Sequence, residues 1–196
     1  SRARDKQVPK RLRAQGAPNP PPLRSEEHPN GLPSLTGLNK EKVVMANILY
    51  LFCTQVANLC IDTGVGFTIE NPTNSYMWMT APFVSLLSRP EVQAVEMDLC
   101  MHGSARNKSQ KLVTNCPEVK EMSKKCDASH THLPWGAMKI GKKWHFATKD
   151  ECAYPVLWCK NLVKCLLPRI KAQNSKLFSK NRSKTAASTN MDLRNV

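Results

Sequence analysis

The chain has 196 residues, of which 41% are hydrophobic and 22% are charged, and its formal net charge is +14. This length and composition predict one soluble globular domain and exclude two large ones. No uninterrupted run of eighteen apolar residues occurs, and the basic, proline-rich start has no apolar signal segment. We therefore expect no membrane span and no secretion, and reduced cysteines in an intracellular protein, nuclear or cytoplasmic.

The positive charge is concentrated at the two ends of the chain. Residues 1–24 carry seven Lys or Arg against one Asp, and residues 169–196 also carry seven against one Asp. Basic ends fit contact with a nucleic-acid phosphate backbone, with a solvated or localisation-type tail as the alternative. Arg2 and Arg4 are the candidate phosphate contacts in the first of these ends.

The first 40 residues hold clustered prolines and few large apolar side chains, which predicts an extended segment. From Val43 to Cys60 apolar residues then recur at three- and four-residue intervals, and this pattern predicts an amphipathic helix of about 20 residues that ends at Gly64. A β-prone stretch, Val65 to Ile69, predicts a strand that stops at Glu70-Asn71-Pro72, as half of a βαβ-type unit. Because ligands of open α/β sheets sit at the carboxyl ends of strands, Glu70 is a candidate for chemistry.

The rest of the pattern predicts an α/β domain over residues 41–168, with no assigned structure over residues 169–196. Thr148 and Glu151 have the spacing of a capping box, and Pro168 is expected to end the last helix. The predicted elements are a helix at 82–87, strands at 94–99 and 111–115 that pair as a hairpin around a basic turn at 103–108, helical turns at 118–125, an irregular loop at 126–141, a strand at 144–147 and a helix at 155–167.

Three short segments occur in a characteristic order and spacing. They are Ser1-Arg2-Ala3, then Ile69-Glu70-Asn71-Pro72, then Cys100-Met101-His102-Gly103 followed by Arg106, Lys108 and Leu112-Val113-Thr114-Asn115. Together they resemble DNA cytosine-5 methyltransferases, particularly the divergent phage, protist and retroelement-associated members. His102 replaces the usual Tyr of that family, and Gln110 replaces the usual Thr.

The resemblance implies a partial S-adenosylmethionine-dependent methyltransferase fold of Rossmann-like type, acting on DNA, with RNA as the alternative. Such enzymes flip a cytosine out of the duplex and attack it with a thiolate while a carboxylic acid holds the edge of the ring. The motif positions assign the role of that acid to Glu70, and Asn71 is its neighbour in the motif. They assign the role of a cation that holds the base to Arg106 or Lys108.

In the same alignment the nucleophilic Cys precedes Ser1 by four residues, and the glycine-rich S-adenosylmethionine loop precedes that Cys. The resemblance thus covers the C-terminal portion of a catalytic domain, over most of residues 1–168. We expect this chain to be inactive alone and to need the missing N-terminal half as a partner. The alternative is a non-catalytic nucleic-acid-binding protein derived from such a domain.

A second group of residues suggests a metal site. Cys126, His130 and His132 lie within seven residues, with Cys116 or His102 as a fourth ligand. The hypothesis that follows is a small zinc-stabilised interaction module, although regular Cys-x-x-Cys spacing is missing. In the methyltransferase interpretation this loop falls where target-recognition elements are inserted, so His130 and His132 would face nucleic acid instead.

Overall fold

The computed structural model describes residues 10–173 of the chain. The helices are α1 (Lys10–Ala14), α2 (Gly37–Asp62), α3 (Ala81–Leu87), α4 (Ala147–Asp150) and a helix over residues 156–173, called here the C-terminal helix. The strands are β1 (Thr68–Pro72), β2 (Gln93–Asp98), β3 (Ser109–Thr114), β4 (Ala137–Ile140) and β5 (Lys143–Phe146). Three short 3-10 helices are η1 (Tyr76–Met79), η2 (Leu99–His102) and η3 (Pro117–Met122).

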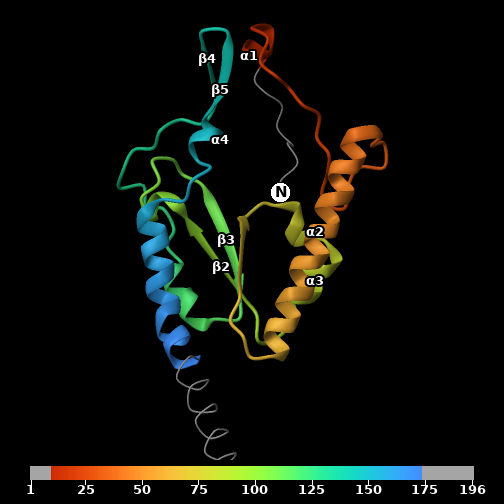
Figure 1. Ribbon diagram of the computed structural model, residues 1–196. Coiled ribbons are helices and arrows are strands. Elements are labelled where there is room, and N and C mark those ends of the chain that lie inside the picture. The colour runs from red at the N-terminus through yellow and green to blue at the C-terminus, as the bar shows by residue number, and fades with distance from the viewer. Residues whose placement is uncertain (1–9, 174–196) are drawn as a thin grey trace, which may run out of the picture.

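The main sheet has the order β1-β3-β2, and β3 is antiparallel to both of its neighbours. β1 and β2 therefore run parallel to each other, and α3 lies on the connection between them. Their carboxyl ends reach the same edge of the sheet, because Pro72 of β1 and Met97 of β2 both lie opposite Gln110 of β3. A second sheet pairs β4 with β5, and this hairpin projects away from the main sheet (Figure 1).

Helices cover both faces of the main sheet, which makes three layers (Figure 1). Successive strand residues point to opposite faces, so neighbours on β3 enter different cores. Val113 is buried with Phe83 and Leu86 beneath α2 and α3, whereas Leu112 is buried with Trp158 of the C-terminal helix. The predicted α/β class is therefore confirmed, as small sheets combined with helices.

Helix α2 is apolar on two sides. Its buried side chains are Val43, Tyr50, Thr54 and Ala57. Tyr50 and Ala57 pack in one core with Phe83 of α3 and Val113 of β3. A second stripe at the same spacing is exposed, and it consists of Met45, Ile48, Leu49, Phe52, Val56 and Leu59. By length and composition alone α2 is able to cross a membrane, which is weak evidence because core helices pass the same test.

The entry into β1 is held by side chains at the end of β3. Asn115 accepts a hydrogen bond from the Phe67 N–H (2.8 Å), and its amide donates to the Val65 carbonyl (2.8 Å). Thr114 Oγ1 donates to the Phe67 carbonyl (2.5 Å). Since these side chains satisfy the backbone before Thr68, the ladder with β3 begins later than the sequence pattern indicated.

The position of β1 corrects the predicted strand at 65–69. Glu70, Asn71 and Pro72 belong to the strand instead of following it, and each pairs with a residue of β3. Pro72 is tolerated because β1 is an edge strand, where a missing N–H leaves no ladder bond unmade. Glu70 consequently lies two residues before the carboxyl end of β1.

Other predicted elements are confirmed or corrected in turn. The hairpin of β2 and β3 and the helical turns of η3 are as predicted. The first 40 residues contain α1 and the start of α2, and the predicted loop at 126–141 contains β4. The capping box at Thr148 and Glu151 is wrong, because Phe146 is the N-cap residue of α4 and makes no side-chain cap.

Pro168 does not end the C-terminal helix, which continues to the last described residue, 173. Proline removes one helical hydrogen bond but leaves the rest of the helix able to form when tertiary contacts hold it. Two such contacts follow Pro168: Arg169 Nη1 donates to the Asn115 carbonyl (3.4 Å) and Gln173 Nε2 donates to the Gly64 carbonyl (3.0 Å).

Candidate functional site

Glu70 and Tyr154 meet on the face of the sheet that the C-terminal helix covers. Glu70 lies opposite Leu112 in the ladder, and its Oε2 accepts a short hydrogen bond from the Tyr154 hydroxyl. Tyr154 stacks on Trp158, with 4.5 Å between ring centroids. Burial and this hydrogen bond to Glu70 raise the pKa of the Tyr154 hydroxyl, so it stays protonated and remains a donor at neutral pH.

The other oxygen of the same carboxylate has no such partner. Glu70 Oε1 is buried and makes no hydrogen bond to any residue that the structure describes. Leaving a buried polar atom unsatisfied costs about 1–3 kcal/mol, and more when the group is charged. One half of the carboxylate is therefore fixed by Tyr154, and the other half is buried with no donor among the described residues.

Asn71 points the opposite way, as strand alternation requires. Its amide nitrogen lies 3.1 Å from Met77 Sδ, on the side of η1 and α3. The structure thus places Glu70 and Asn71, which the sequence grouped together, on different faces of the sheet.

Arg106 lies in the turn that leads into β3, and its side chain is only 10% exposed. Nη1 donates to Glu151 Oε1 (3.2 Å), Nη2 lies 3.3 Å from Asp150 Oδ2, and Nε donates to the Pro134 carbonyl (3.2 Å). The guanidinium also lies over the Trp135 ring, 5.9 Å from its centroid. Every hydrogen bond and ion pair described for Arg106 is thus made with a group other than Glu70.

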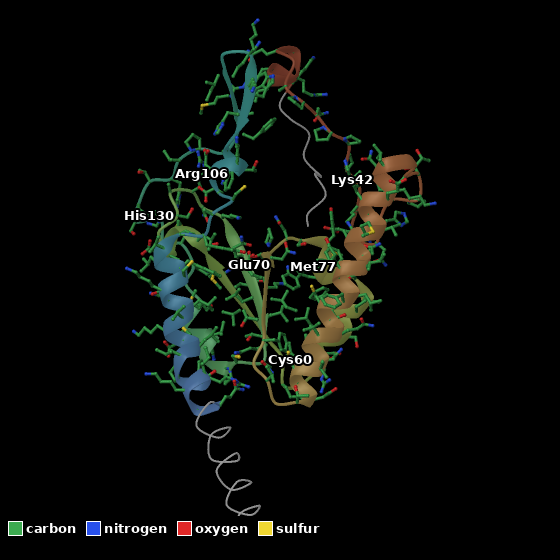
Figure 2. The ribbon with its side chains drawn as sticks, in the orientation of Figure 1. Lys42, Cys60, Glu70, Met77, Arg106 and His130 are labelled. Atoms are coloured by element: carbon green, nitrogen blue, oxygen red, sulfur yellow. The ribbon has the colours of Figure 1, made fainter. Side chains whose placement is uncertain are left out.

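Lys108 and Glu151 complete this group of residues, which we call the edge site (Glu70, Arg106, Lys108, Glu151, Tyr154). Lys108 Nζ donates to the Glu151 carbonyl (3.4 Å), and Glu151 Oε2 accepts from Ser104 Oγ (2.9 Å). Glu151 is three residues before Tyr154, so the ion pair with Arg106 fixes the segment that brings Tyr154 to Glu70. Glu70, Arg106 and His130 are labelled in Figure 2.

The sequence pattern assigned Glu151 only to a capping box and gave Tyr154 no role in a site. A signal was present, since an acid and a tyrosine precede the last predicted helix, but nothing in the pattern showed that this helix returns to the sheet over β1. Arg2 and Arg4, the predicted phosphate contacts, lie outside the described residues.

The structure brings three of the predicted metal ligands together and places the other two elsewhere. Cys126, His130 and His132 come together, and their fourth member is Cys100 of η2. Burial, with Cys126 next in importance, raises the pKa of the Cys100 thiol to about 11. The four residues form what we call the Cys/His cluster.

Cys116 and His102, the predicted fourth ligands, are not part of this cluster. Cys116 is buried in the core beneath the C-terminal helix, with its thiol directed at the Phe67 carbonyl (3.9 Å). His102 is fully buried, its Nε2 donates to the Met122 carbonyl (3.0 Å), and its Nδ1 accepts from Asn161 (3.2 Å). Neither ring nitrogen of His102 is free for a metal.

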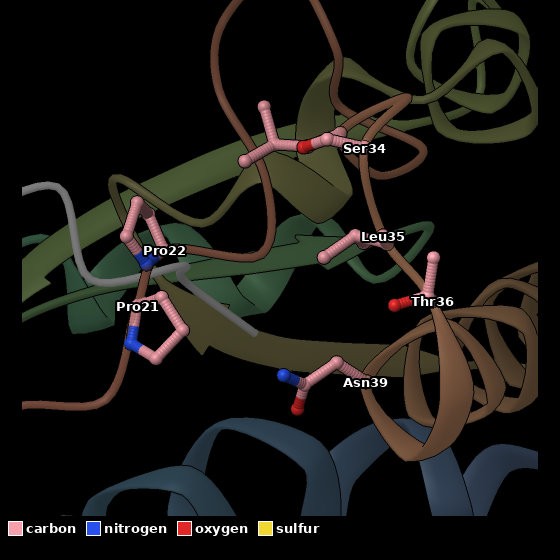
Figure 3. A pocket seen from close by; sticks show the side chains of 7 residues that line it. Pro21, Pro22, Ser34, Leu35, Thr36 and Asn39 are labelled. Atoms are coloured by element: carbon pink, nitrogen blue, oxygen red, sulfur yellow. The ribbon is translucent and has the colours of Figure 1, made fainter.

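A pocket of about 340 Å³ lies elsewhere, between the proline-rich segment and the start of α2 (Figure 3). Pro21, Pro22, Leu35 and Asn39 are among its lining residues. It contains no residue of the edge site or of the Cys/His cluster, and its lining holds no acid, base or thiol.

Comparison of the chain with protein-family models, with curated proteins and with solved structures found no match.

Proposed function

We propose that this chain is the base-holding part of a DNA cytosine-5 methyltransferase-like domain, with Glu70 as the group that holds a flipped cytosine. The observation that carries the proposal is the carboxylate of Glu70. One of its oxygens is fixed by Tyr154, and the other is buried without a partner in the described chain. The carboxyl ends of β1 and β2 lie at the adjoining edge, where α/β sheets bind ligands.

The chemistry of cytosine fits this arrangement. Its exocyclic amine donates hydrogen bonds, and a carboxylate oxygen without a partner accepts one. A protonated Glu70 would instead donate to the ring N3, which favours addition of a nucleophile to the ring. The attacking thiolate and the S-adenosylmethionine loop would come from the N-terminal half of the domain, so the 196 residues alone are expected not to transfer a methyl group.

Two features of the described chain leave room for that half. Among the residues that the structure describes, β1 is an edge strand and pairs only with β3. The exposed apolar stripe of α2 lies on the helix that packs beside β1, and exposed apolar patches mark sites of interaction.

The structure modifies the roles that the resemblance implied for Arg106 and Lys108. Arg106 is engaged by Glu151 and Asp150, so we assign it to positioning the segment of Tyr154 and not to contact with the base. Lys108 holds the same segment through the Glu151 carbonyl. Asn71, on the opposite face, is assigned a structural role toward Met77.

The test is binding of the full chain to two DNA duplexes that differ in one unpaired base, cytosine or thymine. An unpaired base lowers the cost of flipping, and the phosphate contribution is the same for both duplexes. We expect about a fivefold preference for the cytosine duplex, since one discriminating contact is worth about 1 kcal/mol or more. Fluorescence anisotropy measures both affinities.

The variant Glu70→Ala should bind both duplexes equally, while Glu41→Ala, which changes an exposed acid on α2, should keep the preference. Circular dichroism establishes that both variants are folded. Equal binding of the two duplexes by the unchanged chain would overturn the proposal. It would leave the second candidate, a non-catalytic nucleic-acid-binding protein that uses the net charge of +14.

A further inference from the structure

The Cys/His cluster brings four metal-ligand side chains to one point. The ligand atoms of Cys100, Cys126, His130 and His132 all lie within 4.8 Å of one another. Cys126 Sγ is 3.6 Å from His132 Nε2 and 4.0 Å from His130 Nε2, and the two Nε2 atoms are 3.0 Å apart. In a tetrahedral zinc site the corresponding edges are about 3.6 Å between sulfur and nitrogen and about 3.3 Å between nitrogens.

Surrounding groups orient these ligands. The Asp127 carboxylate lies 4.0 Å from His130 Nδ1, which favours a proton on that nitrogen and leaves Nε2 free to bind a metal. The Ala128 N–H donates to Cys126 Sγ (3.4 Å), and the Cys126 N–H donates to Asp98 Oδ2 (2.9 Å). Ala128 has a positive φ of 59°, so the chain accepts an uncommon backbone conformation within the loop.

The two parts of the cluster come from distant segments. Cys100 lies in η2, two residues after the end of β2, and is 9% exposed, whereas Cys126, His130 and His132 lie in the loop after η3. Beyond His132 this loop crosses the turn that carries Arg106. There the Leu133 N–H donates to the Ala105 carbonyl (2.8 Å), and Trp135 Nε1 donates to the Asn107 carbonyl (2.9 Å).

We propose that Cys100, Cys126, His130 and His132 bind one Zn²⁺, which joins the loop after η3 to the end of β2. Two thiolates and two imidazoles in tetrahedral array form a donor set typical of zinc, and two thiolates balance its charge. Four protein ligands leave no open position, so the zinc is structural. It holds the segment Leu133–Trp135 over the turn of Arg106, and this inference does not depend on the proposed function.

The first experiment measures metal in the full chain, purified under reducing conditions and equilibrated with ZnCl₂ before desalting. Elemental analysis should find about one zinc per chain. Cys126→Ser and His132→Ala should each lower this to a small fraction. Cys152→Ser and His28→Ala, which change an exposed cysteine and an exposed histidine outside the cluster, should retain the metal.

Because loss of a structural zinc site also destabilises the protein, a second measurement uses the unchanged sequence. Chelator-treated chain titrated with Co²⁺ should develop the ligand-field and thiolate charge-transfer bands of a tetrahedral cysteine-histidine site, and one equivalent of Zn²⁺ should abolish them. Chelation should also speed tryptic cleavage after Lys124 or Lys125 about tenfold, as the loop opens locally.

Two outcomes would overturn the proposal. One is a chain that stays free of zinc and cobalt after equilibration with either ion, which would leave the histidine pair as a hydrogen-bonded contact only. The other is a Cys116→Ser variant that loses the metal while Cys126→Ser retains it, since Cys116 lies in the core away from the cluster.

Discussion

Glu70 and Tyr154 are 84 residues apart in the chain, and a single hydrogen bond joins them at the edge site. In Tyr154→Phe the ring remains to stack on Trp158, and only the hydroxyl is removed. The carboxylate then loses the one hydrogen bond described for it, and we expect the free energy of unfolding to fall by about 1–2 kcal/mol. Urea denaturation measures this change.

A double-mutant cycle with Glu70→Ala provides the control for that prediction. Without the carboxylate, Tyr154→Phe should cost much less, because the hydroxyl has lost its acceptor. An equal cost in both backgrounds would mean that the effect of Tyr154→Phe does not come from the Glu70 contact.

Glu96 on β2 gives a prediction for the dependence of stability on pH. Partial burial acts to raise the pKa of Glu96, but hydrogen bonds from Lys125 (3.2 Å) and Lys111 (3.3 Å) outweigh it and hold the pKa below its usual value. A carboxyl whose folded pKa is lowered stabilises the protein above its unfolded pKa, and this contribution is lost as pH falls through the folded pKa.

Unchanged protein should therefore lose more stability than Glu96→Gln as pH is lowered below about 4.5. The side chain of Glu96 is 39% exposed, so solvent screening limits the difference to about 0.5 kcal/mol. Urea denaturation of both proteins at a series of pH values measures it. Parallel stability curves across this range would show that the two lysines do not stabilise the folded state through Glu96.

At the scale of the elements, the exposed stripe of α2 predicts self-association of the chain. The double variant Leu49→Gln, Phe52→Gln should bind less of a hydrophobic dye and elute more as monomer from gel filtration. Its stability should change by only about 0.5 kcal/mol, since both side chains are more than half exposed.

Ala57, which is 1% exposed on the other side of α2, provides the matched control. Ala57→Gln should cost about 2–3 kcal/mol, because a larger polar side chain is forced into the core with Phe83 and Val113. If the stripe variant were as destabilised as Ala57→Gln, another part of the same chain would cover the stripe.

For the whole molecule, the net charge of +14 predicts that any DNA binding weakens steeply with salt. Each phosphate neutralised adds about 0.9 to the slope of log affinity against log salt. Residues 174–196 carry five Lys or Arg against one Asp, so a chain that ends at residue 173 should show a smaller slope. Anisotropy titrations at several salt concentrations measure both slopes.

The same truncation separates the two candidate functions. If the edge site holds the base, the preference for unpaired cytosine should survive truncation although the overall affinity falls. Loss of all binding with the tail would favour the non-catalytic nucleic-acid-binding candidate instead.

The spacing of apolar residues and the positions of glycine and proline by themselves predicted most of the helices and strands, because they report local preferences of the backbone. The spacing of apolar residues from Val43 to Cys60 identified α2, and alternation identified β2 and β3 as a hairpin. Boundaries that depend on distant partners were wrong. β1 starts late because Asn115 satisfies the backbone before it, and the C-terminal helix passes Pro168 because Arg169 and Gln173 are held by other segments.

The same division applies to the sites. The sequence by itself singled out Glu70, Cys126, His130 and His132 as candidate site residues, since carboxylates, thiols and imidazoles in short motifs are visible without a fold. Only the tertiary structure decided their partners: Tyr154 for Glu70, and Cys100 in place of Cys116 for the cluster. The physical reason is that these contacts join segments far apart in the chain, and such contacts follow from how the helices pack on the sheet, which no local pattern records.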